Sequence, residues 1–132
     1  MVAQDQVRAD FTIWETDNPL PFFDKLAENV SWTIRGRLNP LAGQYNSRAE
    51  VLDVFGRLSS HFAAPPKAKI MSHFFDGDWA IVEMSFDAIT KGGFNYYEDI
   101  CFICRYEQET IVEVRLYVDT AGEIKVFSES QQ

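Results

Sequence analysis

One glutamate stands in line with apolar residues on a predicted strand. Glu98 is followed at alternate positions by Ile100, Phe102 and Cys104, and alternate residues of a strand lie on one face of a sheet. Burial on such a face raises the pKa of a carboxyl group, because desolvation disfavours its charged form. The group can then give or take a proton near neutral pH, so Glu98 is the first candidate for acid–base catalysis. The alternative is a carboxylate that points to solvent at the start of a strand.

Two further side chains are candidates for the same proton-transfer chemistry. Asp119 ends the next predicted strand, but the apolar alternation of residues 112–118 assigns it to the outer face unless a bulge intervenes. An exposed aspartate at a strand end is therefore the alternative. His73 is predicted to share a face with Met71 and Phe75, where an imidazole can act as acid or base. The alternative for His73 is a hydrogen-bonded histidine of the core or of an interface.

The sequence predicts no metal site. His61 lies near the end of a predicted helix, where its cation suits the helix dipole, and it is far from His73 in the chain. Cys101 and Cys104 are three positions apart on one strand, so their side chains point to opposite faces and cannot easily bridge. No phosphate-binding loop, dinucleotide motif or Ser-His-Asp arrangement is present in the sequence.

An aromatic-rich composition predicts either a bulky core or an aromatic-lined cavity. The chain has eleven phenylalanines and three tryptophans among 132 residues. Tyr96 is predicted to face inward with Glu98, where its hydroxyl needs a hydrogen-bond partner. The candidates for substrate-binding residues are Trp32, Tyr45, Met84, Phe86, Tyr96, Ile100 and Leu116. For each of them alone, ordinary core packing is the alternative.

Length and charge limit the class of protein. A chain of 132 residues forms one domain. The net charge of −8 and the scattered basic residues argue against nucleic acid and anionic membranes as partners. No apolar run has the length of a membrane span, and residues 1–10 contain no apolar signal segment. A cytoplasmic location is therefore expected.

The predicted elements form an α+β domain. Helices are expected over residues 4–16 and 21–28, and a third helix begins at Ser47, which forms a capping box with Glu50. The strands are predicted at 30–35, 68–75 and 79–89, and as two strands within 96–119 joined by a turn at 107–110. Residues 120–132 are expected to form a tail with a fraying polar end. A curved antiparallel sheet over helices leaves a cone-shaped cavity.

Several segments resemble one family. Val30–Gly36, Asn39–Tyr45, the capped helix with Val51 and Phe55, and the ending from Arg105 to Asp119 are similar to the SnoaL-like branch of the NTF2-like (nuclear transport factor 2-like) superfamily. The resemblance covers nearly the whole chain. It implies one domain over residues 1–132, with three N-terminal helices packed on a strongly curved, mainly antiparallel sheet around a hydrophobic cavity.

The resemblance also implies a function. Family members include polyketide cyclases, ketosteroid isomerases, epoxide hydrolases, dehydratases and proteins that only bind ligands, and fold alone does not choose among them. We expect a cofactor-independent enzyme that cyclises, isomerises or dehydrates a hydrophobic, oxygenated polyketide- or terpenoid-like molecule, and a homodimer. The alternatives are a module that binds a small ligand without turnover, and a structural dimerisation domain.

The sequence departs from the ketosteroid isomerase pattern at three positions. Ala9, Thr33 and Phe102 stand where those enzymes carry their tyrosine, base and acid, so steroid isomerisation by that mechanism is not expected. Tyr117-Val-Asp119 keeps a terminal pattern in which, by the resemblance, the aspartate acts as acid or base.

Overall fold

The computed structural model describes residues 1–129. The chain begins with α1 (Gln4–Thr12) and the 3₁₀ turns η1 (Ile13–Glu15) and η2 (Leu20–Lys25). The strands are β1 (Leu26–Ile34), β2 (Gly43–Tyr45), β3 (Lys67–Asp76), β4 (Trp79–Ile89), β5 (Asn95–Glu107) and β6 (Thr110–Val118). The remaining helices are α2 (Arg48–Ser59), between β2 and β3, and α3 (Thr120–Glu129), after β6. No helix within this described part is long and apolar enough to cross a membrane.

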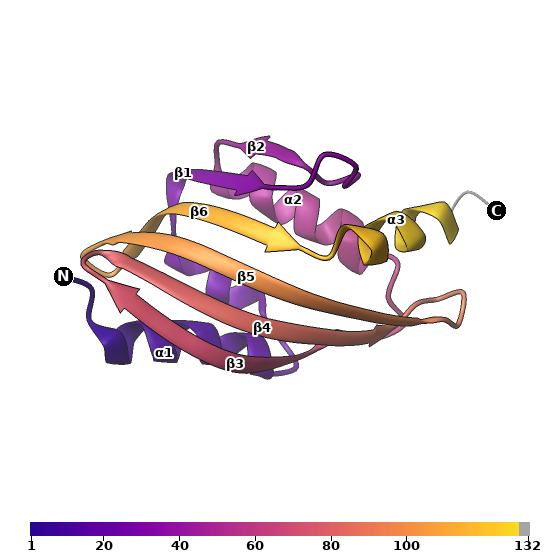
Figure 1. Ribbon diagram of the computed structural model, residues 1–132, viewed down its shortest axis with the longest axis horizontal. Coiled ribbons are helices and arrows are strands. Elements are labelled where there is room, and N and C mark those ends of the chain that lie inside the picture. The colour runs from indigo at the N-terminus through magenta and orange to yellow at the C-terminus, as the bar shows by residue number, and fades with distance from the viewer. Residues whose placement is uncertain (130–132) are drawn as a thin grey trace.

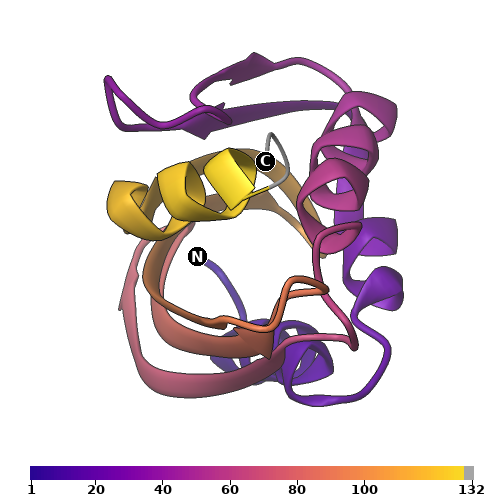
Figure 2. The same cartoon turned by 90° about the vertical axis from the view of Figure 1, so that its right-hand side faces the viewer.

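One curved sheet organises the molecule. Its strand order is β2-β1-β6-β5-β4-β3, and every neighbouring pair is antiparallel except β1 and β6, which are parallel. The long strands bend together along the molecule (Figure 1) and, seen from the end, curl around its interior (Figure 2). The helix α2 lies across from the sheet, while α3 lies over one end. This is the α+β cone expected from the sequence, with a mixed sheet.

An aromatic cluster fills the closed part of the cone. Phe11 of α1 and Phe22 of η2 have ring centroids 5.0 Å apart, and Phe102 of β5 lies 5.3 Å from Phe11. Trp14 packs on Phe22 at 5.1 Å and on Phe86 of β4 at 5.6 Å. Such buried rings account for much of the apolar area removed from water, and they anchor the N-terminal elements on the sheet.

The predicted arrangement of three N-terminal helices is correct only in part. The first predicted helix forms, as α1 followed by η1, but the predicted helix at 21–28 is wrong beyond Lys25. Only the short turn η2 forms there, and β1 begins at Leu26, which pairs with Ile111 of β6. Leu26 is 1% exposed, so packing and pairing with a strand far along the chain override the local helical pattern. Residues 36–46, between the predicted strand at 30–35 and the third predicted helix, also contain the short strand β2, which was not predicted.

The third helix begins where its capping box predicts. The Ser47 hydroxyl oxygen accepts a hydrogen bond from the Glu50 amide at 3.1 Å, and the Glu50 carboxylate accepts one from the Asn46 amide. The Arg48 guanidinium donates two hydrogen bonds to the Leu26 carbonyl, at 2.8 and 3.1 Å. These contacts fix α2 against β1 and turn its apolar side towards the sheet.

The tail, for which no helix was predicted, forms α3 as far as Glu129. The Asp119 carboxylate accepts a hydrogen bond from the Ala121 amide at 3.1 Å, as an N-cap residue does. Val126 is fully buried beside Phe62 and Tyr96. The fraying expected at the extreme end falls on residues 130–132, which lie outside the described residues.

Candidate functional site

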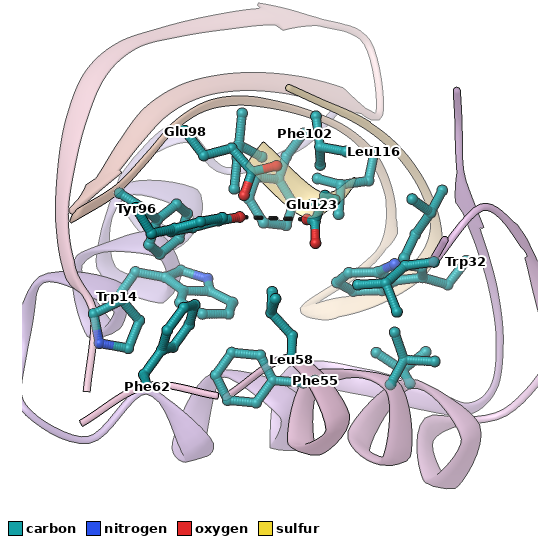
Figure 3. Close-up of a pocket in the computed structure, with 18 of the residues that line it drawn as sticks. Trp14, Trp32, Phe55, Leu58, Phe62, Tyr96, Glu98, Phe102, Leu116 and Glu123 are labelled. Carbon is teal, nitrogen blue, oxygen red and sulfur yellow. Dashed lines mark hydrogen bonds between the residues drawn. The ribbon is translucent and has the colours of Figure 1, made fainter. Parts of the chain in front are cut away.

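A mostly apolar cavity lies between the concave face of the sheet, α2 and α3 (Figure 3). Its volume is about 80 Å³, well below the roughly 300 Å³ at which drug-sized ligand sites begin. Trp14, Trp32, Phe55 and Phe62 are among the aromatic residues of its wall. Of the described residues that line it, only Glu98 and Glu123 belong to the charged types. The cavity therefore suits a compact molecule and brings two carboxyl groups to it.

Glu98 reaches the cavity from the inner face of β5. Its register partner on β4 is Phe86, and Ile100 and Phe102 follow on the same face of the strand. The side chain is 3% exposed. The regular pairing of β4 with β5 has no bulge near Glu98, and this is why the alternation in the sequence predicted its orientation correctly.

Glu123 reaches the same cavity from α3 and is 2% exposed. The Tyr96 hydroxyl donates a hydrogen bond to its Oε1 at 3.4 Å (Figure 3). The hydroxyl partner that Tyr96 was expected to need is thus a carboxylate. Sequence analysis did not propose Glu123, although it stands three residues before Val126, on the same side of a helix.

The two carboxyl groups perturb each other. Burial, and then repulsion by Glu123 and Asp119, raises the pKa of Glu98 from 4.5 to about 10. Burial likewise raises the pKa of Glu123 to about 7, against a hydrogen bond from Glu98 that favours the Glu123 carboxylate. Two carboxyl groups that share a site cannot both ionise easily. Near neutral pH the pair therefore holds a proton, and Glu98 is its protonated member.

Three polar atoms of residues that line the cavity lack a hydrogen-bond partner within the described chain. They are Oε1 of Glu98, Oε2 of Glu123 and Nε1 of Trp14. Buried polar groups are rarely left unpaired, because the cost is about 1–3 kcal/mol each. A carboxyl–carboxyl hydrogen bond can satisfy the first two only while one of them is protonated. These atoms are the polar contacts that the cavity can offer to a bound molecule.

A glycine lets α3 approach the sheet closely enough to deliver Glu123. A Cβ on Gly122 would lie 3.3 Å from Cε2 of Tyr96 and 3.4 Å from the carbonyl oxygen of Tyr97. The Nζ of Lys125 lies 4.5 Å from the centroid of the Phe94 ring, beyond β4, and holds the outer side of the helix. Gly122 therefore sets the position of Glu123 relative to Glu98.

Five of the seven predicted binding residues line the cavity: Trp32, Phe86, Tyr96, Ile100 and Leu116. Tyr45 and Met84 do not. Tyr45 is on β2 and donates its hydroxyl hydrogen to the Leu41 carbonyl at 2.7 Å, while Met84 is fully buried in the core. The sequence can predict that both residues are large and apolar or aromatic and which face of their strands they lie on. It cannot predict whether they reach the cavity.

The other two predicted proton-transfer residues lie outside this cavity. Asp119 is exposed and caps α3, and its backbone amide donates to Glu98 and favours the charged form there. His73 faces α1, with Nδ1 3.4 Å from a guanidinium nitrogen of Arg8. Burial, with help from Arg8, lowers the pKa of His73. A bulge between Ile70 and Ser72 leaves Met71 exposed, so the predicted shared face of Met71 and His73 is wrong.

Within residues 1–129, no group of three or more His, Cys, Asp or Glu side chains is placed to hold a metal ion. The two cysteines are free.

Comparison with solved structures shows the fold. An NTF2-like protein of unknown function from Burkholderia pseudomallei K96243 is 20% identical, with a TM-score of 0.77 over 93% of this chain and 95% of that chain. The chain has the NTF2-like fold. A protein from Catenulispora acidiphila DSM 44928 with a ketosteroid isomerase-like fold, in complex with trimethylamine, is 15% identical, with a TM-score of 0.69 over 88% of this chain and 86% of that one.

A third neighbour in structure is TerC, co-crystallised with polyporic acid. It is 10% identical, with a TM-score of 0.76 over 94% of this chain and 96% of TerC. No protein-family model matches the sequence, and no curated protein matches it. At these identities the comparisons establish the fold, while the chemistry has to be argued from the residues of this chain.

Proposed function

We propose that this NTF2-like protein is a small enzyme that moves protons on a compact, largely apolar molecule, through the pair Glu98 and Glu123. The observation that carries the proposal is this pair of buried carboxyl groups on the wall of one apolar cavity. Isomerisation, dehydration and cyclisation all need a proton added at one atom and removed from another. The SnoaL-like cyclase activity implied by the resemblance belongs to this group.

The pair divides the acid and base roles. Glu123, with the lower pKa, is the base, and Glu98 is the acid. With an unsaturated ketone, Glu123 takes the C–H proton next to the carbonyl as the electron pair moves to oxygen and Glu98 gives its proton there. The dienol forms; Glu123 then returns its proton to the γ-carbon while the enol O–H proton goes back to Glu98, which completes the isomerisation and restores both carboxyl groups. The apolar wall excludes water and strengthens both interactions.

The size of the cavity refines the expected substrate. A volume of about 80 Å³ favours a molecule with one small ring over a polycyclic polyketide. The neighbours with polyporic acid and trimethylamine support a small-molecule site in this fold. We propose no cofactor for the reaction, since both steps are proton transfers between carbon, oxygen and carboxyl groups.

Conversion of cyclohex-3-enone to cyclohex-2-enone tests the proposal, because it needs only proton transfers between carbon, oxygen and the two carboxyl groups. We expect Glu98→Gln and Glu123→Gln each to lower the rate ~10²–10⁴-fold. Glu109→Gln, at the exposed β5–β6 turn, is the matched control and should keep the wild-type rate. A wild-type protein no faster than buffer, or two glutamine variants as fast as wild type, would contradict the proposal.

A non-catalytic ligand-binding module is the second candidate, and the small cavity capped by α3 favours it. Binding of the same enones without turnover would be its signature.

We also propose a homodimer formed by the convex face of the sheet, where Met71, Phe74, Tyr97 and Tyr117 are 47–62% exposed. Sedimentation equilibrium should give a dimer for wild type and a monomer for Phe74→Glu. A monomeric wild type would rule the dimer out.

A further inference from the structure

We propose that the natural ligand of the cavity carries a compact organic ammonium group, which binds between the unpaired carboxyl oxygens and the aromatic wall. The inference deepens the proposed function, because it names a substrate class for the same cavity and rests on that cavity being a ligand site. It stands on three observations: the unpaired oxygens, the rings around them and the lack of a basic side chain in the lining.

The unpaired oxygens call for hydrogen-bond donors. Oε1 of Glu98 and Oε2 of Glu123 meet no fixed donor, and only a proton shared between the two carboxyl groups can pair them. Both residues are buried, with exposed fractions of 3% and 2%. The nearby Tyr96 hydroxyl is already used on Oε1 of Glu123. An alkylammonium has up to three N–H donors and can bridge both oxygens in place of the shared proton, whereas an ether or ketone, which has only acceptors, can accept from the protonated Glu98 but cannot bridge the two groups.

No positive charge of the protein occupies the cavity. Its described lining contains no Lys, Arg or His. Two basic residue types on or beside α3 contact rings instead: the Lys125 ammonium lies over the Phe94 ring, and the His61 ring packs on Phe127 at 4.8 Å. Among the described residues, Tyr96 donates to Glu123 and Asp119 acts on Glu98, and neither adds a positive charge. No described basic side chain of the lining therefore neutralises the two carboxyl groups, and a shared proton holds them together.

The rings of the wall suit a cation. Trp14 and Phe86 meet edge-to-face, with centroids 5.6 Å apart, and Phe86 is the register partner of Glu98. Trp32 meets Phe102 edge-to-face at 6.1 Å. Tryptophan faces attract an ammonium more than other rings do, and the attraction grows when water is excluded. Two carboxyl groups and two indole rings therefore line the same small cavity.

The charges balance for a monocation. A pair that holds one proton has a charge of −1, so one ammonium neutralises the cavity. Glu123 then pairs with the ammonium as a carboxylate, and Glu98 keeps its proton and remains available as an acid. Burying a matched ion pair with hydrogen bonds is far less costly than burying either charge alone. The volume of about 80 Å³ limits the group to a short or branched alkylammonium.

Three probes of similar size separate the contributions. These are tert-butylammonium, with charge and N–H donors, tetramethylammonium, with charge alone, and tert-butanol, which is neutral. Titration calorimetry at pH 8 should show tert-butylammonium binding at least tenfold more tightly than tert-butanol, and tetramethylammonium between them. Tert-butanol binding as tightly as tert-butylammonium would overturn the inference, and so would no binding of either cation.

Binding to variants and at different pH values tests whether the carboxyl pair supplies the negative charge that holds the ammonium. Glu123→Gln should weaken tert-butylammonium at least tenfold and leave tert-butanol unchanged, while Glu109→Gln should change neither. Tetramethylammonium, whose own charge is fixed, should bind more tightly at pH 8 than at pH 6, because the pair must lose a proton to carry its negative charge. Equal affinities at both pH values, or an unaffected Glu123→Gln, would overturn the inference. Enone turnover without ammonium binding would support the proposed function and overturn this inference. Ammonium binding without enone turnover would support this inference and contradict the proposed function.

Discussion

Glu98 on β5 and Glu123 on α3 come from different elements but lie side by side at one cavity, so that neither carboxyl group ionises independently. One belongs to the sheet and the other to α3, which packs on Tyr96 of β5. This difference suggests how the two residues can be tested separately, through pH, through the hydrogen bond that Tyr96 makes, and through the position of the helix.

The pair makes stability depend on pH. Folding raises both pKa values above 4.5, so the folded protein keeps protons that the unfolded chain has lost. The contribution is complete below pH 4.5 and is lost as pH rises, through about 7 for Glu123 and about 10 for Glu98. Each pH unit with one extra bound proton changes the free energy of unfolding by about 1.4 kcal/mol. Urea denaturation between pH 5 and 9 should show this loss, and a Glu98→Gln, Glu123→Gln double variant should lack it. Parallel curves for the two proteins would refute the coupling.

Removing the Tyr96 hydroxyl should affect Glu123 and leave the fold intact. Tyr96→Phe deletes the donor to Oε1 at a buried site, with an expected loss of about 0.5–1.5 kcal/mol in the free energy of unfolding. It should also raise the pKa of Glu123, because a hydrogen bond to the charged form is lost. Carbon-13 NMR of the glutamate carboxyl groups measures this. Tyr97→Phe, at a neighbour 62% exposed, is the control. An unshifted Glu123 in Tyr96→Phe would show that the hydroxyl does not act on it.

Two glycine substitutions compare the helices. Gly56→Ala in α2 meets no atom within 4 Å, so it should stabilise the protein by about 0.5–1 kcal/mol through helix propensity. Gly122→Ala in α3 meets Tyr96 and the Tyr97 carbonyl and should lose that gain or become destabilising. It should also move Glu123 outward and bring the pKa of Glu123 down towards 4.5. Thermal unfolding and the NMR titration test both effects, and equal stabilisation by the two alanines would contradict the close packing of α3.

Asp119 can be tested as a cap and as a catalyst at once. Asp119→Asn preserves an N-cap, so stability and the enone rate should stay near wild type, whereas Asp119→Ala should cost about 1 kcal/mol. A rate loss of about 10²-fold in Asp119→Asn would instead support the acid–base role implied by the resemblance. The same rate assay on His73→Gln decides the role predicted for His73. Both roles remain predictions until then.

Local patterns in the sequence predicted much of the fold. The alternation of β5 gave the inward orientation of Glu98, and the capping box at Ser47 gave the start of α2. The predictions that were wrong concern residues whose conformation depends on partners far away in the chain. Leu26 becomes a strand residue because Ile111 is there to pair with it, and the bulge in β3 reverses the side on which Met71 lies.

Glu123 was missed for a related reason. The tail has few apolar residues and a glycine, which is typical of a disordered end, and its helix is stabilised by packing against β5 rather than by its own sequence. Only knowledge that Tyr96 and Val126 lie side by side would have pointed to a buried carboxyl group on that segment.

The parallel pairing of β1 with β6 has a consequence for how the chain reaches this structure. During synthesis β1 leaves the ribosome early. Only the short β2 can pair with it until β6, the last strand in the chain, has been made. Non-local pairing of this kind slows folding and leaves an apolar edge open to chaperones or to aggregation. Amides of β1 should therefore gain protection from hydrogen exchange together with those of β6, late in refolding, and the cavity can close only after that step.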